Sequence, residues 1–392
     1  MVPIAPERIN LTCLSNRRYH CSSRVFHFHR EGPAPMTMPS RTAVALIILL
    51  FAVCTSLQGE EAPREISLLF CGDVMLDWGI REAVEKEGYG FPLRRIRRFL
   101  SGFDYRFFNM EGPISDRGEP HADKKYIFNV PSGMVRVLAE GRLDGALLAN
   151  NHLSDFGNIA LLDTIANLSA EGIRCAGAGI DAETASLPIL VSRGGISVAV
   201  FSYTNLGYRD AYATASAPGI ARAVLDSMRK DIEQFKRFTD FIVVNLHWGD
   251  EYTNYPSEDQ VEMARALIDG GADAVIGHHS HVYQGIEVYR GRPIVYSLGN
   301  FLFGSINEDI RDNIVVALDF SKKGLSSMRV YPITGNTASH PFQPARLSGG
   351  EAQGVLNHVL DISRPLRSDF PKKAFMVDSS LLYRFDADLK LR

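Results

Sequence analysis

Three histidines follow a short apolar stretch in the second half of the chain. Residues 274–276 form the apolar stretch, Gly277 ends it, and His278, His279 and His281 come next. A short apolar run that ends at a turn residue is typical of a buried strand, and neutral imidazole is the commonest metal ligand in proteins. The pattern predicts a strand that presents imidazoles at its carboxyl end, as a metal site requires. A loop of solvated histidines is the alternative interpretation.

Other short apolar runs also end in oxygen or imidazole donors. The donors that close or follow these runs are Asp73, Asn109, Glu111, Asn150, Asn151, His152, His247, Glu251 and Asn300. The functional crevice of an α/β sheet lies at the carboxyl ends of its strands, so residues from distant parts of the chain are expected to meet there. A mixed set of donors without thiolates suits Mn, Fe, Zn or Mg. It is large enough for one or two divalent ions.

Each donor also has a structural explanation when it is taken alone. Asp73 can cap a turn, Asn150 and Asn151 can form a left-handed turn, and Glu111 can be a surface carboxylate. His247 beside Trp248 can be a hydrogen-bonded core histidine. The joint occurrence of these residues at successive strand ends favours the metal centre over these separate explanations.

The strands that would position the donors alternate with helical stretches. We expect strands at 66–71, 105–110, 144–149, 196–203, 241–246, 274–276, 293–298 and 314–320. We expect helices at 81–87, 93–100, 132–139, 161–170, 221–237 and 352–362, and one more that begins at a capping box formed by Ser257 and Gln260. This alternation predicts an α/β fold with βαβ units. The basic run Arg94–Arg98 is interpreted as the solvated face of a helix.

The composition is typical of a globular protein, and the net charge is small. The chain has 392 residues, of which 45% are hydrophobic and 22% charged, and its net charge is -3. Nothing in this balance indicates nucleic acid as a partner. The cysteines include no CxxC pair, and Cys71 and Cys175 lie beside apolar runs, which favours small buried residues over a disulfide.

The first sixty residues differ from the rest of the chain. Residues 1–37 are rich in arginine and histidine and lack periodicity, which we interpret as an unstructured upstream over-extension, with translation starting at Met36 or Met38. Residues 38–60 contain the apolar run 43–53, which is typical of a signal peptide. An uncleaved anchor is the alternative, and Cys54 is a candidate for lipidation. In either case the remainder is expected to be secreted, periplasmic or anchored at the membrane outside the cytoplasm.

The motifs together resemble the CapA family, the capsule and poly-γ-glutamate synthesis proteins of the metallophosphatase superfamily. They cover residues 66–304 in the order of the family. The matching stretches are Gly72-Asp73-Val74-Met75, Asn109-Met110-Glu111-Gly112-Pro113, Leu148-Ala149-Asn150-Asn151-His152 with Asp155 and Gly157, His247-Trp248-Gly249 with Glu251, Gly277-His278-His279-Ser280-His281-Val282 and Ser297-Leu298-Gly299-Asn300-Phe301.

The resemblance implies a calcineurin-like metallophosphatase sandwich, with two β-sheets flanked by helices and a dinuclear metal site at the sheet edges. It implies a domain over residues 65–345, followed by a carboxyl-terminal extension over 346–392. The metal ligands that it implies are Asp73, Glu111, Asn151, His247, His279 and His281. His152 would contact the substrate and protonate a leaving group, and Asn109, Asn150, His278, Glu251 and Asn300 would surround the ligands.

This chain departs from the superfamily pattern at two places. The usual Asp-x-His motif is replaced by Asp73-Val74-Met75, and the usual Gly-Asp-x-x-Asp motif is replaced by Asn109-x-Glu111. His278 is an extra imidazole that could replace the missing one. One hypothesis is a metal-dependent hydrolase or transferase that acts on an exopolymer or a phosphoester. The other is a non-catalytic accessory protein that binds the polymer or organises a membrane synthesis complex.

Overall fold

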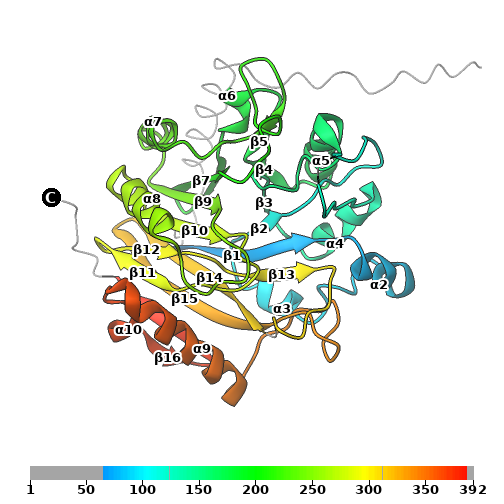
Figure 1. The fold of residues 1–392 in the computed structure, drawn as a ribbon. Helices are drawn as coiled ribbons and strands as arrows, with labels where there is room; N and C mark the ends of the chain where they lie inside the picture. Colours follow the sequence, from blue (N-terminus) through cyan, green and yellow to red (C-terminus); the bar gives the residue numbers. More distant parts are fainter. Residues whose placement is uncertain (1–64, 123, 311, 386–392) are drawn as a thin grey trace, which may run out of the picture. The chain divides into compact units, whose positions relative to one another are not determined.

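Two β-sheets packed face to face form the framework of the protein (Figure 1). The computed structural model describes residues 65–122, 124–310 and 312–385, and within them the larger sheet has nine strands and the smaller sheet six. The larger sheet has the order β16 (Phe375–Val377), β17 (Ser380–Arg384), β15 (Gly324–Thr334), β14 (Asp312–Ser321), β1 (Glu65–Met75), β2 (Tyr105–Met110), β3 (Gly145–Leu147) and β4 (Arg174–Ala176), and β13 (Asn300–Phe303) also pairs with β1. The smaller sheet has the order β11 (Ile286–Tyr289), β12 (Arg292–Val295), β10 (Ala274–His278), β9 (Phe241–His247), β7 (Ile196–Thr204) and β6 (Ile189–Arg193).

The main hydrophobic core lies between the two sheets. Alternate residues of β1, including Leu68 and Phe70, meet Val198 and Val200 of β7 and Val243 of β9 in one buried cluster. Side chains that alternate along a strand point to opposite faces of the sheet, so the residues between them face outward. Burial of both sheet faces explains why these strands read as nearly continuous apolar runs in the sequence.

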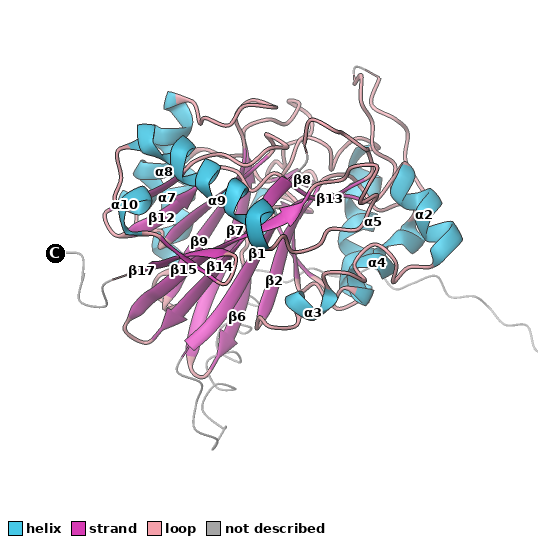
Figure 2. Ribbon diagram, turned by 90° about the horizontal axis from the view of Figure 1, so that it is seen from below, coloured by secondary structure: helices cyan, strands magenta, loops and turns pink. Residues whose placement is uncertain are grey.

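Helices pack around the two sheets (Figure 2). The helices are α2 (Gly79–Glu87), α3 (Arg97–Leu100), α4 (Val135–Glu140), α5 (Gly157–Ala170), α6 (Ala182–Ala185), α7 (Leu225–Phe235), α8 (Glu258–Asp269), α9 (Gly349–Ser363) and α10 (Phe370–Lys373). Apolar residues of α7 and α8 pack on the smaller sheet. Figure 2 shows α4 and α5 to the right of β2, on the side away from α7 and α8. The α/β sandwich expected from the resemblance is therefore confirmed.

Parallel pairing sends the carboxyl ends of the central strands in one direction. In the larger sheet β13, β1, β2, β3 and β4 are parallel neighbours. In the smaller sheet β7, β9, β10 and β12 are parallel neighbours. Residues that follow these strands therefore meet along one edge of the sandwich, as the sequence predicted.

The end of the chain completes the larger sheet. Strand β17 pairs with β15 through Leu381 and Leu382, and α9 contributes Val355, Leu356 and Val359 to the main core cluster. Residues 1–37 and 38–60, with the expected over-extension and signal or anchor, lie outside the described residues. Within the part of the chain that is described, no helix is long and apolar enough to span a membrane.

Several expected elements differ in extent from those observed. The helix expected over 93–100 is an α-helix only at Arg97–Leu100. The helix expected over 221–237 begins at Leu225, because the residues before it pair with β5 (Ala178–Gly179) and with the end of β7. The strand expected over 293–298 ends at Val295, where its pairing with β10 stops.

Candidate metal centre

The sheet registers place the predicted ligands Asp73 and His247 opposite residues that were expected to surround the ligands. Asp73 of β1 is paired with Asn109 of β2 on one side and with Asn300 of β13 on the other. In the smaller sheet, His278 of β10 is paired with His247 of β9. The two sheets then meet at a hydrogen bond, in which the backbone N–H of His279 donates to Asp73 Oδ2 at 3.1 Å.

Two glycines allow the strands of the centre to approach their neighbours closely. A Cβ atom on Gly72 would lie 1.8 Å from the backbone oxygen of Gly299, and one on Gly277 would lie 1.8 Å from that of Tyr296. Any larger side chain would push the strands apart at these points. This close approach explains why glycine precedes both Asp73 and His278.

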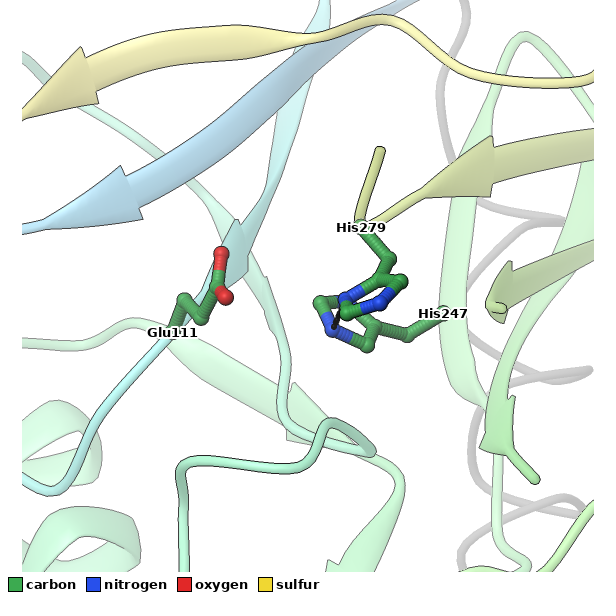
Figure 3. Close-up of side chains that lie close together, drawn as sticks. All are labelled: Glu111, His247 and His279. Atoms are coloured by element: carbon green, nitrogen blue, oxygen red, sulfur yellow. Dashed lines mark hydrogen bonds between the residues drawn. The ribbon is translucent and has the colours of Figure 1, made fainter. Parts of the chain in front are cut away.

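One cluster of candidate ligands joins a carboxylate to two imidazoles (Figure 3). One ligand atom from each of Glu111, His247 and His279 lies within 4.8 Å of the others. His279 Nδ1 lies 3.1 Å from His247 Nε2. Figure 3 shows the carboxylate of Glu111 pointing toward this imidazole pair. The cluster combines strand ends from both sheets.

A second cluster shares Glu111 and adds Asp73 and His281, again with ligand atoms within 4.8 Å of one another. His281 Nε2 lies 3.9 Å from Glu111 Oε1, and its Nδ1 lies 3.9 Å from Asp73 Oδ2. The Oδ1 atom of Asn300 lies 2.9 Å from His281 Nδ1 and fixes the ring. Glu111 therefore belongs to both groups of residues that would hold a cation.

The backbone around the histidines is held in an uncommon conformation. His279 has φ 94 and His281 has φ 58, although neither residue is glycine. Left-handed backbone at such residues costs on the order of 1–3 kcal/mol and persists only where the surrounding structure enforces it. The hydrogen bond from His279 to Asp73 and the contact of His281 with Asn300 provide that enforcement.

The pKa values of the two carboxylates of the centre shift in opposite directions. Burial and the neighbouring charges of Asp73 and Glu251 raise the pKa of Glu111 well above its usual range. Burial also acts to raise the pKa of Asp73, but the neighbouring imidazoles of His278 and His281 and the backbone N–H of His279 outweigh it and lower the pKa. Both carboxylate oxygens of Glu111 are buried and have no hydrogen-bond partner in the described residues.

Burial favours the neutral form of His247 and His279. Burial and the charges of neighbouring histidines place the pKa of His247 well below its usual range. Burial, with the charge of His281, lowers the pKa of His279 to about 4. Neutral imidazole is the form that binds metal ions. A cation would also satisfy the unpaired carboxylate of Glu111, so the residues present are compatible with a divalent metal site.

A row of amides builds the turn that presents Asn151 and His152. Asn150 Nδ2 donates to Asn109 Oδ1 at 3.2 Å and to the Met110 carbonyl at 2.7 Å. Asn150 Oδ1 accepts the backbone N–H of His152 at 3.0 Å. Asn151 Oδ1 then reaches His247 Nε2 at 2.8 Å. The predicted ligand Asn151 therefore lies beside the imidazole cluster, whereas Asn109 and Asn150 shape its surroundings.

His152 is oriented by a buried carboxylate. Its Nδ1 lies 2.8 Å from Asp155 Oδ2, which also accepts the Phe128 backbone N–H at 2.8 Å. The ring of Phe128 stacks on the imidazole, with the two centroids 3.9 Å apart. Lys124 forms an ion pair with Asp155 and also donates to the Asn151 carbonyl. Because Asp155 occupies Nδ1, the Nε2 atom of His152 is the nitrogen left for a substrate.

A pocket of about 360 Å³ opens beside His152 and Asn151. Its other lining residues include Lys125, Tyr126 and Glu251. The pocket therefore reaches the candidate ligand Asn151, and it gives a bound molecule access to His152. Glu251, which the sequence placed near the ligands, is exposed at this opening rather than inside the cluster.

His278 and Met75 are the two residues whose roles the sequence did not decide. His278 is buried, and its Nδ1 lies 3.2 Å from Asp73 Oδ1, but neither ring nitrogen has a hydrogen bond in the described residues. It belongs to neither ligand cluster. Met75 is fully buried, and its sulfur accepts the Asp77 backbone N–H at 3.2 Å. Position 75 therefore has a packing role in this chain.

Two residues of the site had no assigned role in the sequence analysis. Asp155 lies three residues after His152, a spacing that could have indicated the pair. Lys124 has a nearly buried side chain, but nothing in the local sequence distinguishes it from the exposed Lys125. The position of Lys124 depends on the fold of a long loop, which no periodicity describes.

The fold and the site define an α/β sandwich with a candidate metal centre at the carboxyl ends of its strands. The family described as bacterial capsule synthesis protein PGA_cap matches residues 67–305. The chain belongs to this family, and the resemblance drawn from its motifs is confirmed.

Curated relatives agree with the family match. The chain is 31% identical over 270 residues to the PGA biosynthesis protein CapA of Bacillus subtilis (strain 168), covering 68% of this chain and 71% of that protein. It is 30% identical over 309 residues to the capsule biosynthesis protein CapA of Bacillus anthracis, with 74% and 75% covered. It is 28% identical over 355 residues to a probable polyglutamine synthesis accessory protein of Mycobacterium tuberculosis (strain H37Rv), with 77% and 92% covered.

Solved structures give a more distant likeness. A 5'-nucleotidase precursor from Thermus thermophilus is 15% identical and superposes with a TM-score of 0.40, covering 77% of this chain and 59% of that one.

Proposed function

We propose that this protein is a metal-dependent hydrolase or transferase of exopolymer assembly, working on a capsule or poly-γ-glutamate chain outside the cytoplasm. The observation that carries the metal-dependent part is the buried carboxylate of Glu111, which has no hydrogen-bond partner in the described residues and faces the imidazoles of His247 and His279. Leaving such a group unpaired is costly, and a cation removes the cost.

The residues that would hold one or two divalent ions are Asp73, Glu111, Asn151, His247, His279 and His281. The donor set suits Mn, Fe, Zn or Mg. When bound, such an ion stabilises negative charge that develops on the scissile group. The presence of two clusters that share Glu111 supports a site for one or two ions.

His152 would act on the leaving group from the pocket side. Asp155 holds its Nδ1, so the proton to be transferred would be carried on Nε2. Burial lowers the pKa of His152, and the hydrogen bond and charge of Asp155 oppose this effect. A negatively charged substrate group beside the ring would favour the protonated form further. His152 would then serve as a general acid.

The polymer role rests on the relatives, whose names refer to capsule, PGA and polyglutamine synthesis. The location outside the cytoplasm rests on the apolar run 43–53, read as a signal peptide or an anchor. The substrate bond would be a phosphoester or a γ-glutamyl amide, both of which place an electrophilic centre beside an anionic group.

The proposal is tested by assaying the purified full chain, loaded with Mn²⁺, against a phosphodiester and against poly-γ-glutamate. Cleavage of one of them is expected, and Asp73→Ala or His279→Ala should abolish it. His340→Ala is the matched control, because His340 lies outside both ligand clusters, and it should keep wild-type activity. If both centre variants remain as active as the wild type, the metal-dependent mechanism is wrong.

A second candidate is an accessory protein that binds the polymer or organises a membrane synthesis complex. Met75 favours it, because a buried methionine stands where the superfamily pattern has a histidine. The name of the Mycobacterium tuberculosis relative also describes an accessory protein. The metal content of natively produced protein separates the two candidates, since an accessory role predicts none and the enzyme predicts one or two ions per chain.

A further inference from the structure

A second large cavity lies at the opposite end of the strands that carry the candidate metal centre. It has a volume of about 1020 Å³, and its lining comes from α3 and the segment before it, from α4 and the turn after it, and from the turn that precedes β4. Asn109 and Glu111 lie at the carboxyl end of β2, whereas α3 lies just before its amino end. Because a six-residue strand spans roughly 20 Å, the cavity is well separated from the metal centre.

The lining of this cavity is strongly basic. It contains two carboxylates, Glu140 and Glu171, against five arginines, and the aromatic ring of Tyr89 also borders it. We call this cavity the arginine cleft, and its arginines are Arg94, Arg97, Arg98, Arg136 and Arg142. The arginines of the basic run Arg94–Arg98 are exposed, as predicted. Two further arginines of the cavity, Arg136 and Arg142, come from a later segment of the chain.

Three of the arginines are held in place by neighbours. Arg97 forms an ion pair with Glu140 and donates its Nε–H to the Glu140 carbonyl at 2.8 Å. The guanidinium of Arg136 lies 5.4 Å from the ring centroid of Tyr89, and that of Arg94 lies 5.4 Å from the ring centroid of Phe91. Guanidinium groups that are stacked or paired lose less rotational freedom when they bind a ligand.

The other two arginines carry uncompensated charge. Arg98 and Arg142 are exposed, and their guanidinium groups form no hydrogen bond or ion pair within the residues that the structure describes. Like charges that line one cavity raise the local positive potential and attract anions. Planar guanidinium groups bind carboxylates and phosphates through paired hydrogen bonds. Several such groups around one cavity suit a ligand that repeats its anionic groups.

We infer that the arginine cleft is a second binding site, which holds a segment of an anionic polymer through its carboxylates. The choice of carboxylate rests on the proposed function, since poly-γ-glutamate carries one on every residue. A concave cavity suits a flexible chain better than it suits the flat surface of a membrane. Contact at two separate sites would keep a polymer attached while one part of it occupies the metal centre.

The inference is tested with the full chain and fluorescein-labelled poly-γ-glutamate, followed by fluorescence anisotropy. The double variant Arg98→Gln with Arg142→Gln should weaken binding roughly tenfold or more, because two charge-assisted contacts are lost. The matched control is Arg237→Gln with Arg367→Gln, which removes the same charge from exposed positions outside the cleft and should keep the wild-type Kd. Thermal melting of each variant checks its fold.

Two further arms separate this inference from the proposed function. His279→Ala should leave most of the polymer affinity intact, because the cleft is remote from the metal centre. If His279→Ala abolishes binding and the arginine variant does not, the polymer binds at the centre alone, and the cleft assignment is overturned while the proposed enzyme stands. If the arginine variant binds the polymer as tightly as the wild type, the arginine contacts are overturned. If the wild type in addition holds no metal and shows no activity, the proposed function is overturned as well.

The remaining arm uses vesicles of phosphatidylglycerol in phosphatidylcholine. The wild type and the arginine variant should bind them equally. The contrary outcome is that the wild type binds the vesicles but not the polymer, and that the arginine variant no longer binds the vesicles. This outcome would assign the cleft to lipid headgroups and overturn the inference.

Discussion

Asp73 Oδ2 accepts the backbone N–H of His279 at 3.1 Å, across 206 residues of sequence. This contact joins the end of β1 in the larger sheet to the end of β10 in the smaller sheet. It brings a carboxylate and an imidazole-bearing turn together through a hydrogen bond between protein groups. The packing of the two sheets therefore builds the candidate centre, and the positions of its residues depend on the whole sandwich.

Asp155 should matter for turnover and not for metal binding. Asp155→Asn removes the charge that holds His152 through Nδ1 but touches no residue of the ligand clusters. We expect kcat to fall on the order of a hundredfold, the usual contribution of a positioned proton donor. Metal content per chain should stay at the wild-type value. A variant that loses its metal would show instead that Asp155 acts on the centre itself.

Lys124 should stabilise the loop that carries Asn151 and His152. Lys124→Met leaves the buried Asp155 carboxylate without its ion pair, and breaking a buried pair costs about 3–5 kcal/mol of unfolding free energy. The neighbouring Lys125→Met is the matched control, because Lys125 is exposed. Urea unfolding of both variants measures the difference. Equal stability of the two variants would contradict a structural role for Lys124.

Gly72 should be intolerant of even a methyl group. Gly72→Ala places a Cβ atom against the backbone of Gly299, and overpacking of this kind costs about 1–3 kcal/mol or more. Gly354 in α9 is the control, since a Cβ atom there meets nothing within 4 Å. Gly354→Ala should raise stability by about 0.5–1 kcal/mol, because alanine favours a helix. Thermal unfolding gives both values, and a stable Gly72→Ala protein would contradict the close approach of β1 and β13.

The sequence predicted the elements that are long and apolar. The expected strand 241–246 is observed as β9 (Phe241–His247), and the expected strand 196–203 is observed as β7 (Ile196–Thr204). The capping box of Ser257 and Gln260 is confirmed, with Gln260 backbone N–H donating to Ser257 Oγ. In these segments, local propensity and tertiary packing favour the same structure.

Elements that depend on tertiary pairing were missed or misjudged. Strand β13 begins at Asn300, directly after a turn at Gly299, and it forms only because β1 offers a free partner there. The positions of Lys124 and of the arginine cleft likewise depend on segments that are distant in sequence. For the site, residue types and strand ends were predictable from the sequence. The sharing of Glu111 between two clusters and the burial of its unpaired carboxylate were not, because both depend on how the sheets pack.

The most direct test of the metal centre is a titration of metal-free full chain with Mn²⁺ and with Zn²⁺, followed by isothermal titration calorimetry. We predict saturable binding of one or two ions per chain by the wild type. Glu111→Gln keeps the size of the side chain and removes its charge, so it should weaken binding of both ions at least tenfold, a loss of about 1.4 kcal/mol or more. Absence of binding by the wild type, or equal binding by Glu111→Gln, would contradict the metal centre.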